Sequence, residues 1–199
     1  MNDLALLLSG GIDSTALAFQ FRPRLGITID YGQRSARGEI RAAEQVAKEL
    51  SIEHEIVRVD CSHLGSGDLS SQPALPCAPE REWWPYRNQF LVTVAVMRGI
   101  SLGIKTLIVG SVKSDSFHID GQPGFYEKLD SLVSMQEGGI RVEAPASQLS
   151  TAELVRASGA PLSLLGWTHS CHTGEFACGQ CRGCLKHRSV FLELGYGDL

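Results

Sequence analysis

The chain has 199 residues, of which 43% are hydrophobic and 20% charged, and its formal net charge is −4. This length fits one domain, or one domain with a small appendage, and the composition excludes a disordered chain. The negative charge argues against extended nucleic-acid binding, which needs a basic face. No apolar run reaches the ~20 residues of a membrane-spanning helix, and residues 1–4 lack the basic start of a signal peptide. We therefore expect a cytoplasmic protein with no membrane segment.

The first half of the chain alternates short apolar runs with helical patterns. Residues 4–8 are a continuous apolar run, which indicates a central strand buried on both faces. A helical pattern follows from Asp13 to Phe19 and ends before Pro23. The next segments predict, in order, a strand at 25–29, a helix with one apolar face at 37–50 and a strand at 53–59.

The second half begins with a long segment at 61–85 that is rich in Gly, Ser and Pro, as lids and binding loops often are. Residues 88–102 predict a helix, 106–110 a strand and 111–123 a polar loop. The remaining segments predict, in order, a helix at 125–136, a strand at 140–144, a short helix opened by a capping box at Ser150, and a closing helix at 185–194.

This alternation predicts an α/β fold, with a parallel sheet and crossover helices. Three of the predicted strands end in small or polar residues, at 9–11, 30–32 and 110–111. Because the carboxyl ends of parallel strands share one edge of a sheet, we expect these residues to line one binding site. We expect residues 1–165 to form the domain that carries this site, and residues 166–199 to form a C-terminal segment packed on it.

Residues 9–15, Ser-Gly-Gly-Ile-Asp-Ser-Thr, connect the first strand to the first helix. The glycines permit a tight turn, and the helix N-terminus and hydroxyl groups attract an anion. Asp13 beside a phosphate requires a cation such as Mg²⁺. The segment has neither the Gly-Lys-Ser/Thr of a Walker loop nor a dinucleotide fingerprint. It predicts a distinct phosphate-binding loop, with a glycine-rich turn and a helix-capping Asp13 as the plainer alternative.

Four cysteines crowd one short segment, with the spacing C-x6-C-x2-C-x2-C: Cys171, Cys178, Cys181 and Cys184. Short C-x2-C loops allow the backbone to turn around one ion, and four thiolates complete a tetrahedral shell. A closed shell leaves no open position, so the pattern predicts a structural Zn²⁺ site. An iron–sulfur cluster and disulfides are the alternatives.

The loop at 9–14 resembles the PP-loop of the N-type ATP pyrophosphatases, which adenylate a substrate oxygen and release pyrophosphate from ATP. Further motifs match at 30–34, 85–88, 120–123 and 178–181. Together they make the chain, from residue 4 to about residue 195, similar to the 7-cyano-7-deazaguanine synthases of queuosine biosynthesis.

The resemblance implies that 7-carboxy-7-deazaguanine is adenylated and that ammonia displaces AMP to give an amide. A second ATP then activates the amide, and loss of AMP leaves a nitrile. ATP, Mg²⁺ and Zn²⁺ are the implied cofactors, free ammonia is the simplest nitrogen source, and a homodimer is the implied assembly. Such an enzyme mainly positions reactants and neutralises phosphate charge.

Residue roles follow from these matches. The implied catalytic residues are Asp13, Arg87 and Lys113. The implied ATP-binding residues are Leu8, Ser9, Gly10, Gly11, Asp13, Ser14, Tyr31 and Gln33. The implied substrate-binding residues are Arg87, Asn88, Asp115 and Asp120. Plainer roles stay open for several of them: a surface ion pair for Arg87, a helix cap for Asn88, turn positions for both aspartates, and packing rather than base stacking for Trp84 and Phe117.

The chain departs from the family pattern on the acceptor side of the site. Trp84 and Tyr86 flank Pro85 where the family has smaller residues, and Gln122 stands where the family has Arg. Three alternatives follow. In the first, the enzyme stops at the amide or transfers the acyl group to another amine, including one on a protein. In the second, the chain is a PP-loop tRNA sulfurtransferase with an iron–sulfur cluster. In the third, it is a non-catalytic zinc-ribbon module.

Overall fold

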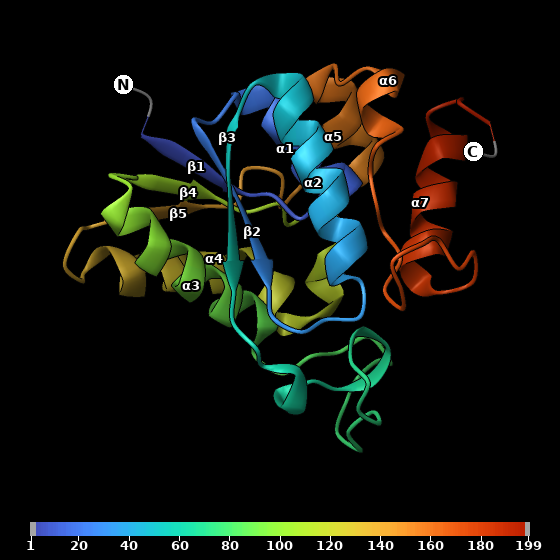
Figure 1. Ribbon diagram of the computed structural model, residues 1–199, viewed down its shortest axis with the longest axis horizontal. Coiled ribbons are helices and arrows are strands. Elements are labelled where there is room, and N and C mark those ends of the chain that lie inside the picture. The colour runs from blue at the N-terminus through green and yellow to red at the C-terminus, as the bar shows by residue number, and fades with distance from the viewer. Residues whose placement is uncertain (1–2, 198–199) are drawn as a thin grey trace.

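The computed structural model describes residues 3–197. Its centre is a five-stranded sheet in which every strand pair is parallel (Figure 1). The strand order is β3-β2-β1-β4-β5, made of β1 (Leu4–Leu7), β2 (Leu25–Asp30), β3 (Glu53–Arg58), β4 (Thr106–Ile108) and β5 (Arg141–Glu143). In register, Ala5 of β1 lies between Leu25 of β2 and Leu107 of β4. The predicted fold class, a parallel α/β sheet with crossover helices, is confirmed.

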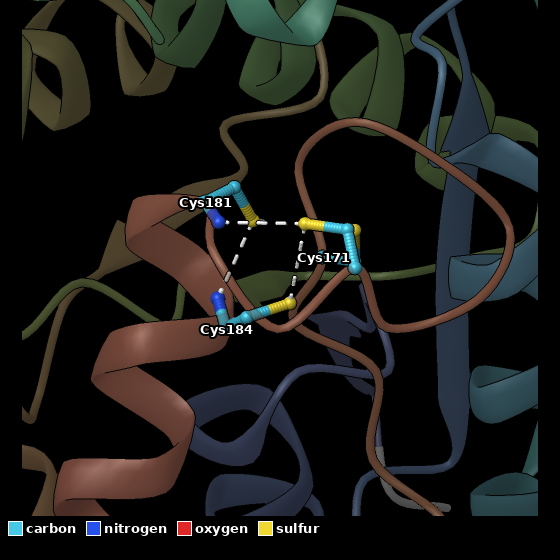
Figure 2. Close-up of side chains that lie close together, drawn as sticks. Cys171, Cys181 and Cys184 are labelled. Atoms are coloured by element: carbon cyan, nitrogen blue, oxygen red, sulfur yellow. Dashed lines mark hydrogen bonds between the residues drawn. The ribbon is translucent and has the colours of Figure 1, made fainter.

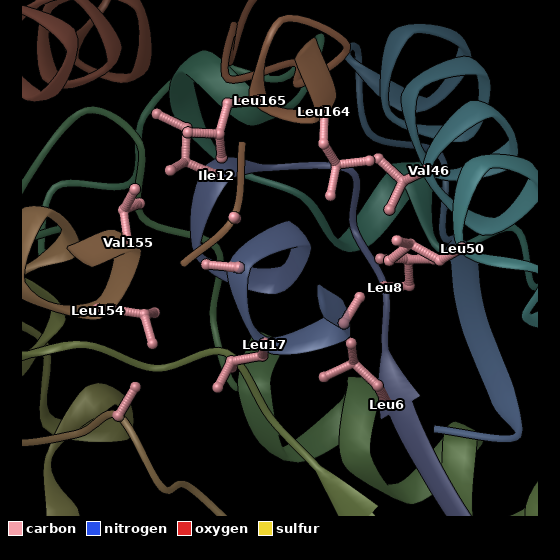
Figure 3. Close-up of a cluster of buried hydrophobic side chains, with 14 of the residues drawn as sticks. Leu6, Leu8, Ile12, Leu17, Val46, Leu50, Leu154, Val155, Leu164 and Leu165 are labelled. Carbon is pink, nitrogen blue, oxygen red and sulfur yellow. The ribbon is translucent and has the colours of Figure 1, made fainter. Parts of the chain in front are cut away.

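Helices cover both faces of the sheet, each over its own apolar core. One core joins β1 to five helices: α1 (Ile12–Phe21), α2 (Ala36–Leu50), α5 (Thr151–Ser158), α6 (Leu162–Leu165) and α7 (Arg182–Glu193). Figure 3 labels side chains that β1, α1, α2, α5 and α6 contribute to it. The other core joins the opposite sheet face to α3 (Arg87–Ser101) and α4 (Pro123–Ser134). Because Leu6 faces the first core and Ala5 the second, β1 is buried on both sides, as its continuous apolar sequence predicts.

Several element boundaries differ from the predicted ones. The last helix, α7, begins at Arg182 rather than residue 185, because Sγ of Cys181 accepts a hydrogen bond from the backbone N–H of Cys184 and so caps the first turn. The short helix α6 was not predicted. The capping box at Ser150 is confirmed by both of its reciprocal hydrogen bonds with Glu153.

Both long polar segments contain short 3₁₀ turns that the sequence pattern does not predict. The segment predicted as a loop at 61–85 holds η1 (Ser62–Leu64) and η2 (Gly67–Leu69), and the loop after β4 holds η3 (Lys113–Phe117) and η4 (Ile119–Gly121). Runs of three to five residues are too short for a hydrophobic period to be recognised.

The C-terminal helix packs on the same core as the sheet. Val190 and Phe191 of α7 are buried in the cluster that holds α1, α2 and β1, and Arg156 of α5 donates to the Glu193 carbonyl at 2.8 Å. No helix within residues 3–197 is both long and apolar enough to cross a membrane.

An ion pair fixes the edge strand β5 to α4 and gives a testable contribution to stability. The Asp130 carboxylate accepts from Nε and Nη2 of Arg141 and, at 2.8 Å, from the Val142 N–H. The hydrogen bond from Arg141 holds the pKa of Asp130 below its usual range. A lowered carboxyl pKa stabilises the fold above the ordinary value of about 3.9, and this contribution is lost as pH falls through the lowered pKa.

We therefore expect Asp130→Asn to lower the free energy of unfolding by about 1 kcal/mol at neutral pH, because Arg141 is largely exposed and solvent screens the pair. Urea titrations at about pH 7 and about pH 3 would measure the change. The difference between variant and wild type should shrink at the lower pH. Glu137→Gln, at an exposed position seven residues further along the chain, serves as the control. A loss that stays constant with pH would contradict this assignment.

Candidate active site

A cavity of about 300 Å³ opens at the carboxyl ends of β1, β2 and β4. It lies where the strand order reverses between β1 and β4, the position at which open α/β sheets bind ligands. The polar residues of its lining are Ser9, Asp13, Ser14, Thr28, Glu39, Arg87, Asn88, Ser111, Asp115, His118, Tyr126 and His172. Leu8, Gly11 and Tyr31 also line it, so most of the predicted nucleotide-binding residues are brought together.

The PP-loop connects β1 to α1 at one wall of this cavity. Gly11 is the N-cap of α1 and has no side chain to satisfy the first-turn N–H groups, which leaves them available to an anion. The hydroxyls of Ser9 and Ser14 lie 3.1 Å apart, and Ser14 donates to the Gly11 carbonyl. The loop therefore presents hydroxyl and backbone donors together, as a phosphate cradle requires.

Gly10 has a different role from the residues that line the cavity. Its φ is +75°, and a Cβ atom there would stand 2.7 Å from the Glu39 carbonyl oxygen and 2.8 Å from the Ala43 nitrogen, both in the backbone of α2. The Gly10 carbonyl accepts from the His169 N–H at 2.9 Å. Gly10 thus shapes the loop by letting α2 approach closely, while Gly11 faces the ligand side.

Asp13 brings an incompletely satisfied carboxylate to the loop. Its Oδ2 accepts from Nζ of Lys186 at 3.1 Å, whereas its buried Oδ1 has no hydrogen-bond partner. Burial, and to a smaller extent the charge of Asp115, raise the pKa of Asp13, whereas Lys186 and the nearby Thr151 side chain oppose that rise. An unpaired carboxylate oxygen beside a phosphate cradle fits Mg²⁺, which prefers carboxylate and phosphate oxygens. The residues present therefore fit the predicted Mg²⁺.

Arg87 begins α3, which packs on the other face of the sheet from α1, and it lines the same cavity. Desolvation lowers the pKa of Arg87, but Tyr31, Asp120 and Asp115 together raise it by more, so the guanidinium stays charged. Its Nε donates to Oδ1 of Asn88 at 3.3 Å. A planar cation in this position can bind a carboxylate or a phosphate through two parallel hydrogen bonds.

Asn88 and the two predicted aspartates organise the loop after β4. The Asn88 amide donates to the Asp120 carbonyl at 2.9 Å, and its backbone N–H donates to Oδ2 of Asp120 at 3.3 Å. Asp120 therefore caps α3 from the neighbouring loop and is not among the residues that line the cavity. Asp115 does line it: Oδ2 accepts from the Val112 N–H, and Oδ1 lies 3.6 Å from Nζ of Lys186.

The residues after β2 divide between lining and support. Tyr31 lines the cavity, and its ring packs edge-on against Trp84 at 4.9 Å between centroids. Trp84 is only 5% exposed, so it packs in the core. Gln33 is also buried, and its side chain bonds the Tyr31 N–H, the Ile29 carbonyl and the Glu39 carboxylate. Gln33 thus holds Glu39 in the lining rather than facing the cavity itself.

The structure brings a different lysine to the site from the one that the sequence resemblance implies. Lys113, the predicted catalytic lysine, is exposed and is not among the lining residues. Lys186, for which the sequence offers no functional signal, is not among the lining residues either, but it contacts two residues that are: Asp13, 173 positions away in the chain, and Asp115. Sequence reasoning also missed Glu39, His118, Tyr126 and His172, whose contribution depends on tertiary packing alone.

The four cysteines converge at the start of α7. Their sulfur atoms all lie within 4.8 Å of one another, with Cys178 and Cys184 at 3.9 Å and Cys171 and Cys181 at 4.0 Å. Figure 2 labels three of them, Cys171, Cys181 and Cys184. Four thiolates at about 2.3 Å from one tetrahedral ion would stand about 3.8 Å apart. The His172 N–H donates to Sγ of Cys181, an interaction that favours the thiolate form. The cluster therefore fits a metal centre.

The chain matches the family model described as queuosine biosynthesis protein QueC over residues 4–195. It is 33% identical to a 7-cyano-7-deazaguanine synthase of Acidobacterium capsulatum, over 94% of this chain and 90% of the relative. It is 31% identical to the enzyme of that name from Stutzerimonas stutzeri, over 97% of this chain and 95% of the relative.

A solved structure with a similar fold is the U34-tRNA thiolase NcsA from Methanococcus maripaludis with its [4Fe-4S] cluster. The TM-score is 0.52 and the sequence identity 17%, and the match covers 94% of this chain but 62% of the thiolase. This likeness extends to the PP-loop fold alone. The family match over nearly the whole chain goes further: the chain belongs to the queuosine biosynthesis protein QueC family.

Proposed function

We propose that this protein is an ATP-dependent C–N ligase that converts 7-carboxy-7-deazaguanine and ammonia into 7-cyano-7-deazaguanine. The observation that carries the proposal is one cavity lined both by the PP-loop cradle with Asp13 and by Arg87. A phosphate cradle and a cation that can bind a carboxylate, in one cavity, suit the adenylation of a carboxylic acid. The name shared by relatives of similar length supports the substrate.

In the first step, a carboxylate oxygen of the substrate attacks the α-phosphorus of ATP, and pyrophosphate leaves. The first-turn N–H groups of α1 and the hydroxyls of Ser9 and Ser14 would hold the phosphates, and Asp13 would hold Mg²⁺, which neutralises phosphate charge when bound. Arg87 would orient the substrate carboxylate. Ammonia then attacks the acyl carbon, and AMP and one proton leave as the amide forms.

In the second half, the amide oxygen attacks another ATP and pyrophosphate leaves. Loss of AMP from this adduct forms the carbon–nitrogen triple bond, and the two N–H protons of the amide are lost over these two steps. Glu39 and His118 line the cavity and are the proposed proton acceptors. Nδ1 of His118 is buried without a hydrogen-bond partner, and its Nε2 lies 3.9 Å from the Glu82 carboxylate.

The altered acceptor-side residues lie outside the cavity lining, which favours the nitrile product over the alternatives. Gln122 is exposed and donates to the Ser116 carbonyl, and Tyr86 is 78% exposed.

For the metal of the four-cysteine site, we propose Zn²⁺ in a structural role. The sulfur spacing supports one ion, because the irons of a cubane cluster would hold four thiolates farther apart. Homodimer assembly and cytoplasmic location remain predictions.

Mass spectrometry of one reaction tests the proposal. Purified protein with ATP, Mg²⁺, ammonium and 7-carboxy-7-deazaguanine should give the nitrile, with AMP and pyrophosphate. Asp13→Asn should lower the rate at least ~100-fold, because it removes charge from the phosphate site. Lys128→Met, at an exposed position on α4, is the matched control. An amide as the final product, or a mass added to the protein, would replace the proposed reaction with one of the acyl-transfer alternatives.

A further inference from the structure

Lys186 is a cation that joins two of the three carboxylates that line the cavity, Asp13 and Asp115. Its Nζ lies 3.1 Å from Oδ2 of Asp13 and 3.6 Å from Oδ1 of Asp115, and its side chain remains 36% exposed. The PP-loop itself contains no lysine, unlike the Walker loop. Lys186 therefore brings a positive charge to the phosphate cradle from another part of the chain.

The four-cysteine centre determines where α7 begins and thus where Lys186 lies. Cys181 and Cys184 flank the first residues of the helix, and Lys186 follows Cys184 by two positions. Gly183 is required at this point, since a Cβ atom there would stand 1.8 Å from the Ser170 carbonyl oxygen. The first turn of α7 is thereby pressed against the segment that carries Cys171.

A second cation on the same turn supports this organising role. Arg182, one helical turn before Lys186, forms an ion pair with Glu82 of the long loop between β3 and α3 and lies over the Phe117 ring at 5.4 Å. Figure 1 shows α7, in red, with its first turn directed toward that loop. Residues four apart share one face of a helix, so one turn of α7 reaches both the loop and the PP-loop.

We propose that Lys186 is the phosphate-binding cation of this site and that the metal held by the four cysteines positions it. The proposal rests on the proposed function only in its ATP-binding step. In the free protein, Lys186 neutralises Asp13 and Asp115. With MgATP bound, Asp13 would hold Mg²⁺ and Lys186 would donate to a phosphate oxygen. Lys186 is then a binding residue, and the cysteine centre acts through it.

Isothermal titration calorimetry with MgATP tests the first claim, that Lys186 binds phosphate. We expect Lys186→Met to weaken MgATP binding about 10- to 100-fold, the range of a lost charged hydrogen bond, and Lys186→Arg to restore most of it. Lys113→Met provides the direct comparison, because sequence reasoning favours Lys113 and the structure favours Lys186. Lys128→Met is the exposed-surface control. Unchanged affinity in Lys186→Met, or a larger loss in Lys113→Met, would overturn the assignment.

Metal removal tests the second part. Wild type and Lys186→Met are each stripped with a chelator, checked by circular dichroism for retained secondary structure, and titrated again with MgATP. If the metal acts through Lys186, stripping should weaken binding by wild type about 10-fold or more but change the variant much less, because the two losses are not additive. Equal losses in both proteins would show that the metal acts elsewhere.

Binding separates this proposal from the proposed reaction. If wild type binds MgATP but forms no nitrile, the reaction assignment fails while the role of Lys186 is still decided by the titrations. If Lys186→Met binds MgATP as tightly as wild type, the role of Lys186 is rejected even where nitrile forms. A structural ion pair alone would lower the thermal midpoint of Lys186→Met without changing its MgATP affinity.

Discussion

Cys181→Ser is expected to lower the metal content of the protein from one ion per chain to a small fraction of an ion per chain. Cys181 is buried, its sulfur lies 4.0 Å from that of Cys171, and it caps α7 by accepting from the Cys184 N–H. Serine provides a poor ligand for a thiolate-rich site, and three thiolates leave the shell open. The same change therefore removes a metal ligand and the helix cap.

The thermal midpoint of Cys181→Ser should fall by about 10 °C, corresponding to about 3 kcal/mol for a domain of this size. With the first turn of α7 released, Lys186 and Arg182 would lose their positions, so MgATP affinity should fall as well. Elemental analysis measures the metal, and differential scanning calorimetry the midpoint. Cys77→Ser, at an exposed position in the long loop, is the matched control and should retain metal and midpoint.

The same elemental analysis distinguishes the metal. Zinc without iron, in a colourless protein, is the expected result. Iron with acid-labile sulfide and a brown colour would contradict the zinc assignment and would favour the sulfurtransferase alternative. Full metal content in Cys181→Ser would contradict the four-cysteine site itself.

Gly10→Ala is expected to lower the free energy of unfolding by about 2–5 kcal/mol and to abolish MgATP binding. A residue with φ of +75° costs about 1–2 kcal/mol when it carries a Cβ atom. Overpacking adds about 1–3 kcal/mol, since the new methyl would meet the backbone of α2 at Glu39 and Ala43, which cannot rotate away. Any relief would move α2 away from the PP-loop and so distort the cradle.

Gly11→Ala is the matched control for stability, because it makes the same change one residue later. Gly11 has φ of −76°, and its added Cβ would meet nothing closer than 3.4 Å. Urea denaturation should find this variant close to wild type in stability, whatever its effect on ligand binding. If Gly10→Ala were as stable as Gly11→Ala, the close approach of α2 to the loop would not be the reason for a glycine at position 10.

Local sequence information was sufficient wherever a short segment determines its own structure. The apolar run at 4–8, followed by Ser-Gly-Gly, predicts a buried strand that ends in a tight glycine turn, and the structure has both: β1 is covered on both faces, and Gly10 has a positive φ. The capping box at Ser150 is equally local, since Glu153 lies one turn away. The start of α7 was misplaced because a cysteine that caps a helix and also faces a metal site is not recognised by residue propensity.

The sequence alone thus determined the parallel α/β class, the PP-loop and the set of four cysteines, since each depends on spacing within a few residues or on apolar periodicity. Only the tertiary structure decided which polar groups share the cavity. It placed Lys186 rather than Lys113 against Asp13, and it turned Gln33 inward to support Glu39. These contacts join segments far apart in the chain, and they depend on how α7 and the loop after β2 pack, which local patterns do not encode.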